Sequence, residues 1–312
     1  MAARPSRIFA AGDAPTDAPR RLLLRAAEVV ARAGVLRLSA RRLHDGAPGG
    51  AHLSTRRGGG VEFAEHRDYA PGDDLRHLDW HATARRDRLL VKRFQTEVHS
   101  DLWLVIDGSA SMALSHATTL DECDKWASVT TIAMALALIA LREGDAVGLE
   151  VPGAIAMPPR GGPLARQRVA EALSSHRPGG DSGLPTLRPG RRGRCSVIVF
   201  SDVLAPPEAA VAALGVLVRA GAEVTLAQTL HPLERTFAFD DLVELHCEES
   251  GVVQLFDPRA AAEAAALMAE HRLAVRQAAA EVGVRLIELE LEDDPSAILR
   301  AFVHALGSGV PR

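Results

Sequence analysis

From about residue 101 onward, short apolar runs alternate with longer helical patterns, and this alternation constrains the fold more than any other feature of the sequence. Continuous apolar runs are typical of strands that are buried on both faces of a sheet. The expected strands are residues 102–106, 146–151, 196–200, 223–228 and 284–291, and the expected helices are residues 120–142, 164–175, 207–219, 258–282 and 296–306. Repeated strand–helix units predict an α/β fold, with a doubly wound, mostly parallel sheet between two layers of helices.

The first hundred residues follow a different pattern. Residues 1–19 are rich in Ala, Pro, Arg and Asp, and we expect a disordered tail there. An amphipathic helix is expected before Gly34, and a small β-rich unit is expected around the turn signal Pro71-Gly72, with strands at 61–69 and 89–98. The predicted division is a tail (1–19), a helix with a β-rich unit (20–98) and an α/β domain (99–312).

Composition narrows the classes of function. The net charge of −4 and the isoelectric point near 6.3 give no basic field for nucleic acid, so we expect no nucleic-acid partner. Three widely spaced cysteines favour a reducing compartment. The longest apolar run, residues 131–141, is shorter than the roughly 20 residues that a membrane span needs. From these features we predict a cytoplasmic protein without a membrane span.

The residues directly after the first buried strand carry oxygen ligands at regular spacing. Asp107, Ser109 and Ser111 follow the run 102–106, at the strand end where ligands of parallel sheets bind. Carboxylate and hydroxyl oxygens suit a hard cation such as Mg²⁺. Asp202 follows the run 196–200, and it would meet Asp107 if these two strands are neighbours. The alternative is a helix-capping turn without metal, because Asp and Ser are favoured caps.

Two segments resemble known families. The stretch LVIDGSASM, residues 104–112, resembles the metal-ion-dependent adhesion site of von Willebrand factor A domains. Residues 62–97 resemble the signature of the bacterial domain-of-unknown-function family fifty-eight, in which such a segment precedes an A-type domain. The signature residues are Arg67, Tyr69, Pro71, Gly72, Asp73, Asp74, Arg76, Asp79, Trp80, Thr83, Ala84 and Arg85. The resemblance extends over roughly residues 35–305.

The resemblance implies a set of metal ligands. Ser109 and Ser111 would bind Mg²⁺ (or Mn²⁺ or Ca²⁺) directly, and Asp107 and Asp202 would bind it directly or through water. The family usually supplies a threonine from a later loop, and that threonine is missing from the corresponding stretch, residues 179–183. Either Ser182 or Asp181 takes its place, or the ligand is lost.

The N-terminal signature has two interpretations. In the structural one, Arg67, Arg76 and Arg85 pair with acidic residues and bind the β-rich unit to the sheet domain; those acidic residues are Asp73, Asp74 and Asp79. In the other, the same segment, with Tyr69 and Trp80, forms a surface for a partner.

The resemblance further implies a non-enzymatic protein-interaction module that partners a MoxR-type AAA+ ATPase in chaperone-like maturation or stress response. One alternative is a structural scaffold with a degenerate metal site. A metal-dependent phosphohydrolase that uses Asp107 is less favoured, because Ser109 stands where a second Asp is expected and Lys125 is the only lysine after the motif.

Overall fold

The structure is a computed structural model, and it describes most of the α/β region and parts of the N-terminal region. The described residues are 17–38, 42–45, 61–71, 73–86, 88–96, 100–117, 122–180, 185–187, 194–237, 243–246 and 253–307. Nearly all of the predicted tail, residues 1–16, lies outside them.

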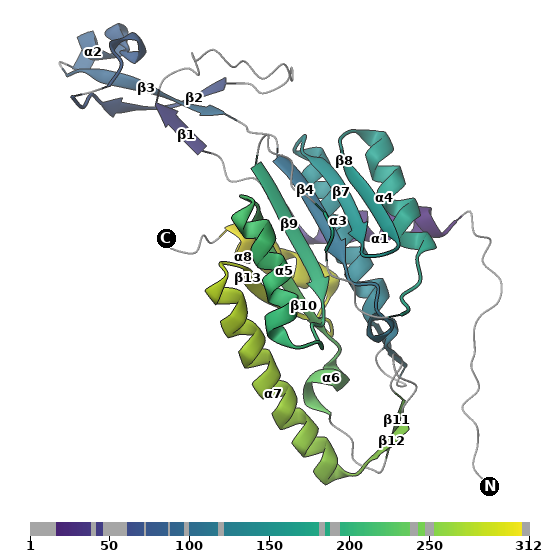
Figure 1. Cartoon of the computed structure of the whole chain (residues 1–312). Coiled ribbons are helices and arrows are strands. Elements are labelled where there is room, and N and C mark those ends of the chain that lie inside the picture. The colour runs from purple at the N-terminus through teal and green to yellow at the C-terminus, as the bar shows by residue number, and fades with distance from the viewer. Residues whose placement is uncertain are drawn as a thin grey trace.

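A six-stranded sheet forms the centre of the molecule (Figure 1). Its strands, in spatial order, are β13 (Arg285–Glu290), β10 (Glu223–Leu230), β9 (Arg194–Ser201), β4 (Ser100–Ile106), β7 (Ala146–Val151) and β8 (Ile155–Arg160). All neighbouring strands are parallel except β8, which runs antiparallel to β7. The predicted α/β class and mostly parallel sheet are therefore confirmed. The sequence did not predict β8, whose two prolines are tolerated because it is an edge strand.

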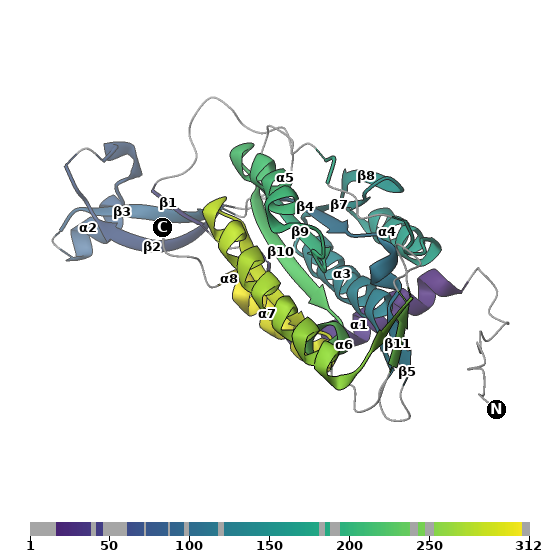
Figure 2. The same ribbon diagram turned by 60° about the horizontal axis from the view of Figure 1, so that its bottom comes forward.

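Helices cover both faces of the sheet (Figures 1 and 2). One face carries α1 (Ala18–Ala33), α3 (Lys125–Arg142), α4 (Pro163–Ser175) and α8 (Pro295–Gly307), and the other carries α5 (Pro207–Arg219) and α7 (Pro258–Glu281). Each face has its own apolar core, because successive side chains of a strand point to opposite faces. Leu104 belongs to the core beneath α3, and its neighbour Val105 belongs to the core beneath α5.

The first helix, α1, is part of the α/β unit. It packs against α3, α4 and α8, and its Ala26 and Val29 are buried in their shared core. The segment after it is bound to the end of α3: Arg142 Nη2 donates to Leu36 O (2.8 Å) and Leu38 N donates to Glu143 Oε2 (3.1 Å). The sequence-based division placed this helix with the β-rich unit, and these contacts place it with the sheet instead.

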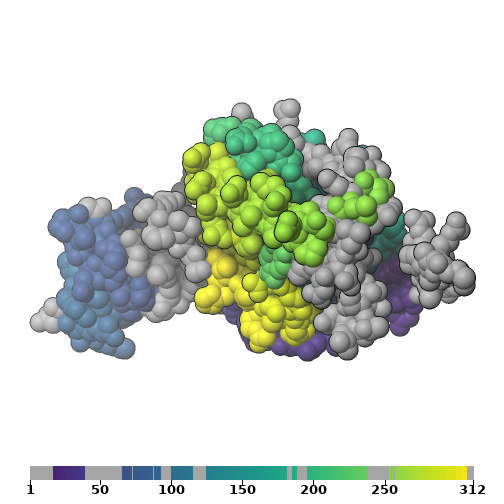
Figure 3. All heavy atoms as spheres, turned by 90° about the horizontal axis from the view of Figure 1, so that it is seen from below, coloured from purple at the N-terminus to yellow at the C-terminus, as the bar shows by residue number. Residues whose placement is uncertain are grey.

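A small antiparallel sheet projects from the α/β unit, and we call it the β arm (Figures 1 and 3). It contains β1 (Arg42–Asp45), β3 (Leu90–Thr96) and β2 (Val61–Asp68), in this spatial order, with the 3₁₀ helix η1 (Leu75–His77) and α2 (Trp80–Arg86). The two predicted strands correspond to β2 and β3. The helix α2 was missed, and its start is fixed by Asp79, whose Oδ1 accepts from the backbone N–H groups of His81 and Ala82.

Short elements surround the carboxyl edge of the main sheet. They are η2 (Ala110–Ala113), the hairpin β5 (Ser115–Ala117) and β6 (Glu122–Asp124), α6 (Pro232–Thr236) and the hairpin β11 (Val243–His246) and β12 (Val253–Phe256). The helix expected from residue 120 begins at Lys125, because residues 122–124 pair with β5 and Asp124 caps the helix by accepting from Ala127 N (2.9 Å).

Among the described residues, one helix is long and apolar enough to cross a membrane by length and composition. That helix is α3, and 72% of it is buried inside the structure.

Candidate functional site

The three predicted residues after β4 lie together in one tight turn. Asp107 is buried, and its N–H donates to Phe200 O (2.8 Å), which extends the ladder between β4 and β9 by one residue. Its Oδ1 accepts from Ser109 N (3.0 Å), and the hydroxyls of Ser109 and Ser111 lie 3.0 Å apart. A carboxylate and two hydroxyls therefore converge at the carboxyl edge of the sheet.

The strands β4 and β9 are neighbours, as the sequence argument required, but their register changes the expected partner of Asp107. Ile106 pairs with Phe200, so Ser201 lies opposite Asp107. The Ser201 hydroxyl donates to Asp107 Oδ2 (2.7 Å). The expectation that Asp202 meets Asp107 is corrected: Asp202 comes one residue later in the chain and binds a different group.

That group is the ammonium of Lys125, the first residue of α3. Lys125 is completely buried, and its Nζ lies 2.7 Å from Asp202 Oδ2 and 2.9 Å from Glu234 Oε2. It also lies 3.4 Å from the carbonyl oxygen of Ser111. Because an ammonium has three donors, these contacts use its whole capacity. We call these residues, Lys125, Asp202 and Glu234, the ionic cluster.

Glu234 belongs to α6 and connects the ionic cluster to that helix. Its Oε2 also accepts from His231 N (2.7 Å), while His231 Nδ1 accepts from Leu233 N (3.2 Å). These reciprocal bonds form a capping box at the start of α6. Burial raises the pKa of Glu234, and the positive charge of Lys125 opposes that rise.

The backbone after Asp202 has an unusual conformation. Val203 has a φ of 52°, in the left-handed region that a β-branched residue rarely adopts. Its N–H donates to the Ser201 hydroxyl (3.0 Å), and its carbonyl lies 2.6 Å from His271 Nε2 on α7. These two contacts hold the strained residue in place.

The loop that the sequence identified as a source of ligands does reach the turn. Gly179 N donates to Gly108 O (2.7 Å), and Ala110 N donates to Gly180 O (3.0 Å). The two candidate ligands in this loop, Asp181 and Ser182, lie outside the described residues.

Close packing explains the glycine within the turn. A Cβ atom at Gly108 would lie 2.7 Å from Val151 Cγ1 and 3.0 Å from His176 Nε2. Burial lowers the pKa of His176, and its ring packs 5.3 Å from that of Trp126. The turn is therefore pressed against the ends of β7 and α4.

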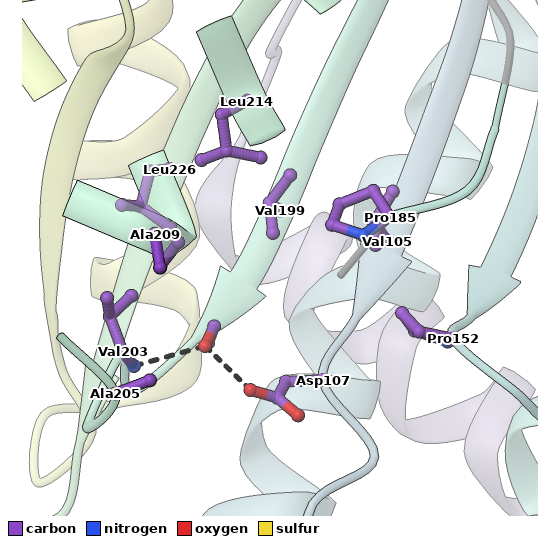
Figure 4. A pocket seen from close by; sticks show the side chains of 12 residues that line it. Val105, Asp107, Pro152, Pro185, Val199, Val203, Ala205, Ala209, Leu214 and Leu226 are labelled. Carbon is purple, nitrogen blue, oxygen red and sulfur yellow. Dashed lines mark hydrogen bonds between the residues drawn. The ribbon is translucent and has the colours of Figure 1, made fainter. Parts of the chain in front are cut away.

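A pocket of about 240 Å³ opens beside Asp107 on the α5 face of the sheet (Figure 4). Its walls are mainly apolar, and Asp107, at one side (Figure 4), supplies a polar group together with Ser201, which donates to it. The lining residues are Val105, Asp107, Pro152, Pro185, Val199, Ser201, Val203, Ala205, Ala209, Ala210, Leu214 and Leu226. Apolar walls with a few oriented polar groups are typical of ligand and side-chain pockets.

One wall of the pocket is held by a buried carboxylate. Glu150, at the end of β7, accepts from Thr186 N (2.7 Å), Thr186 Oγ1 (2.5 Å) and Leu187 N (3.2 Å). These bonds fix the short segment that begins at Pro185, which lines the pocket.

The signature residues of the β arm pair with one another. Arg67 makes a bidentate contact with Asp73 (2.8 and 2.9 Å), and this hydrogen bonding lowers the pKa of Asp73. Asp79 Oδ2 lies 2.8 Å from His66 Nε2 and 3.5 Å from Lys92 Nζ. Hydrogen bonding to His66 is the main cause of the lowered pKa of Asp79. The sequence-based interpretation used such pairs to join the β-rich unit to the sheet domain, and these contacts instead stabilise the arm internally.

The other signature residues of the arm are mostly exposed. Arg76 lies 3.6 Å from Asp74, but its side chain is 88% exposed. Trp80 is 64% exposed, Arg85 is exposed and Tyr69 is half-buried. The arm thus combines an internal ion-pair network with an exposed aromatic side chain.

The ligand set implied for a divalent ion does not fit this geometry. Asp202 was assigned to the ion, yet its carboxylate contacts the ammonium of Lys125. Both oxygens of Asp107 accept protein hydrogen bonds. Within the described part of the chain, no group of three or more His, Cys, Asp or Glu residues is placed to hold a metal ion. The two serines remain in position, and the second carboxylate does not.

Sequence reasoning missed the residues that complete the site. Ser201, Lys125 and Glu234 were not expected as its members, and Lys125 was considered only in the argument against a phosphohydrolase. A signal was available, since Lys125 is one of only two lysines in the chain and begins a helix that is otherwise largely apolar. No such signal marked Glu234, because its contact with Lys125 depends on where α6 lies in the folded protein.

The fold and this edge define an α/β protein with a polar site at the carboxyl ends of two neighbouring parallel strands. The model of the family described as "Protein of unknown function DUF58" matches residues 65–276, more than half of the 312-residue chain. The chain belongs to this family.

Relatives in two mycobacteria extend over most of the chain. Uncharacterized proteins of Mycobacterium bovis and Mycobacterium tuberculosis are each 29% identical over 291 residues, which is 88% of this chain and 88% of theirs.

Three solved structures of bacterial proteins are similar to part of this chain. An aerotolerance-related membrane protein from Bacteroides fragilis has a TM-score of 0.43 and 15% identity, over 67% of this chain and all of that one. The conserved hypothetical protein BatB from Bacteroides thetaiotaomicron has a TM-score of 0.40 and 14% identity, over 67% of this chain and 97% of that one. A membrane spanning protein from Vibrio fischeri also matches, with a TM-score of 0.23 and 19% identity over 67% and 98% of the two chains. The predicted cytoplasmic location is contradicted by the membrane proteins in this group, and we withdraw it.

Proposed function

We propose that this protein is a non-enzymatic protein-interaction module whose α/β unit is von Willebrand factor A-like. Two features support this type of fold: five parallel strands followed by one antiparallel edge strand, and a DxSxS turn directly after the strand β4. The carboxyl edge of the sheet is the expected binding surface of such a fold.

The observation that carries the proposal is the pocket beside Asp107. It is apolar over most of its wall, and polar groups of Asp107 and Ser201 lie at its side. An apolar side chain of a partner would fit against the apolar wall, and a neighbouring hydrogen-bond donor of the same partner would reach the polar groups at the side. Well-packed pockets of this kind often carry most of the energy of a protein interface.

The polar groups at this edge are already engaged within the protein, which favours binding over catalysis. Asp107 accepts from Ser109 N and the Ser201 hydroxyl, and the buried Lys125 ammonium is enclosed by carboxylates and a carbonyl. A phosphohydrolase would need Asp107 as an accessible nucleophile and a cation directed toward the substrate. The metal implied by the family resemblance is not part of the proposal, because Asp202 is engaged elsewhere.

The first partner to test is a MoxR-type AAA+ ATPase, which the resemblance implies, with a role in chaperone-like maturation or stress response. The experiment measures binding of purified wild-type protein to such an ATPase by calorimetry, with and without ATP. Ala209 is exposed on α5 and lines the pocket, so Ala209→Arg should fill the pocket and weaken binding at least tenfold. Ala212→Arg places the same side chain on the same helix outside the pocket lining and should bind as wild type.

The alternative is a structural scaffold with a degenerate metal site, and the Lys125–Asp202 contact is the observation that favours it. A scaffold without this docking site predicts equal behaviour of the two arginine variants. An Ala209→Arg variant that binds as tightly as Ala212→Arg would contradict the pocket as the interface, and no binding by wild type would reject this ATPase as the partner.

A further inference from the structure

The ionic cluster takes up Asp202, one of the carboxylates that the sequence predicts as a ligand of a divalent cation, and it contacts the DxSxS turn through the carbonyl oxygen of Ser111. Its three side chains come from the start of α3, the end of β9 and α6, and a backbone carbonyl of the DxSxS turn completes it. These segments are distant in the sequence: 77 residues separate Lys125 from Asp202, and 109 separate it from Glu234. The ammonium group of Lys125 therefore joins four segments at the carboxyl edge: the start of α3, the end of β9, α6 and the DxSxS turn.

The oxygen atoms around Lys125 resemble the donor set of a hard cation. Asp202 and Glu234 supply carboxylate oxygens at 2.7 to 3.0 Å from Nζ, and Ser111 supplies a carbonyl oxygen at 3.4 Å. Carboxylates and carbonyls are the ligands that Mg²⁺ and Ca²⁺ take in proteins. The distances here suit an ammonium hydrogen bond, and they exceed the 2.0–2.6 Å typical of those ions.

The burial of Lys125 makes its charge essential to the edge. The Lys125 side chain is 0% exposed, that of Asp202 is 3% exposed and that of Glu234 is 14% exposed. Buried carboxylates are stable only when a cation or hydrogen-bond donors compensate them. Without the ammonium, two carboxylates would face each other in a desolvated space.

We infer that Lys125 is a built-in cation that replaces the divalent ion of an adhesion-type site, so that the carboxyl edge is assembled and charge-balanced without metal. Asp202, which would be a ligand in a metal-containing site, is committed to this lysine. The partner is then recognised by the serine hydroxyls and the neighbouring pocket, without a metal-bound carboxylate. This assembly of the carboxyl edge of the sheet does not depend on which partner binds there.

The test compares metal dependence of wild type with that of Lys125→Ala. Calorimetric titration of Mg²⁺ and Mn²⁺ into chelator-treated wild type should show no saturable binding, and its Tm should be the same in EDTA and in Mg²⁺. The alanine variant should lose about 10 °C in Tm in EDTA, because its carboxylates are uncompensated. Added Mg²⁺ should restore a part of that loss by binding the vacated oxygens.

Two further variants make the result specific. Lys92→Ala removes the other lysine, which pairs with Asp79 in the β arm, and its Tm should not respond to Mg²⁺. In Lys125→Ala/Asp202→Asn, the Mg²⁺ response should be lost. Saturable metal binding by wild type would overturn the inference, and this arm holds even where Lys125→Ala fails to fold. A folded Lys125→Ala whose Tm is equal in EDTA and Mg²⁺ would overturn it as well.

Discussion

The Lys125 ammonium lies 2.7 Å from the Asp202 carboxylate, and both side chains are almost completely buried. This ion pair joins the start of α3 to the end of β9 at the edge where the DxSxS turn lies. Asp202 is thus engaged by Lys125, and Ser201, which lies opposite Asp107 in the register of the neighbouring strands, donates to Asp107.

The contributions of Lys125 and Asp202 to the free energy of unfolding should depend strongly on each other. Removal of one partner from a buried ion pair leaves an uncompensated charge, and such changes cost about 3–5 kcal/mol. We expect Lys125→Met to lower the free energy of unfolding by about that amount, as measured by urea denaturation. Because Glu234 also contacts Lys125, Asp202→Asn should cost less than Lys125→Met. In the double variant the two losses should not add, and strictly additive losses would contradict the contact.

The two lysines should differ sharply in chemical accessibility. Lys125 is completely buried, whereas the Lys92 side chain is 40% exposed. In the native protein, an amine-reactive reagent should label Lys92 and leave Lys125 unlabelled, as mapped by peptide mass spectrometry. Both should react after unfolding in urea. Equal labelling of the two residues in the native state would contradict the burial of the ionic cluster.

Gly108 should resist replacement because of the close packing around it. An added Cβ would lie 2.7 Å from Val151 Cγ1, so the turn or β7 must shift. We expect Gly108→Ala to destabilise the protein by about 1–3 kcal/mol, the usual cost of overpacking. The matched control is Gly179→Ala, where the added Cβ meets no atom within 4 Å. Equal thermal stability of the two variants would contradict the packing of the turn.

Trp80 in the β arm should matter little to stability. Its side chain is 64% exposed, and exposed substitutions usually change stability by less than about 0.5 kcal/mol. Trp80→Ala should therefore unfold as wild type. Leu90→Ala in β3 should cost about 2–5 kcal/mol, because Leu90 is only 1% exposed. A large loss of stability in Trp80→Ala would assign this side chain a structural role instead of a role in binding.

The buried Cys195 should be unreactive until alkaline pH. Burial, with a smaller effect of Asp101, raises the pKa of its thiol to about 11 from an ordinary value of 9.0. The thiolate is the reactive form, so at pH 9 the reactive fraction should be only about 1%. Alkylation of Cys195, followed by mass spectrometry, should accelerate as pH rises from 9 to 11 and should be fast at pH 9 in urea. Rapid alkylation of the native protein at pH 8 would contradict this burial.

Much of the fold was predictable because its sheet is buried on both faces. The apolar runs of β4 and β9 have no other stable location, and helices such as α5 carry clear start and stop signals. The edge strand β8 was missed, because its two prolines argue against a strand unless its edge position is known. The helix α2 was missed because its seven residues are too few for a periodic pattern.

The candidate site was predicted in part. The convergence of Asp107, Ser109 and Ser111 follows from their place after a buried strand, and the structure shows it. The contact of Asp202 with Lys125 was not predicted, because the register between β4 and β9 places Ser201, one residue before Asp202, opposite Asp107. No sequence pattern specifies that register. The contact of Lys125 with Glu234 spans 109 residues, and it depends on tertiary packing alone.

Lysine-selective NMR of the intact protein tests the central claim most directly, because the chain contains only two lysines. The protein would be labelled with ¹⁵N in the lysine side chains and titrated with Mg²⁺ and then with paramagnetic Mn²⁺. The account predicts a slowly exchanging Lys125 ammonium signal that neither ion shifts or broadens. A Lys125 signal that moves on addition of Mg²⁺ and disappears with stoichiometric Mn²⁺ would place a divalent ion at this edge and contradict the account.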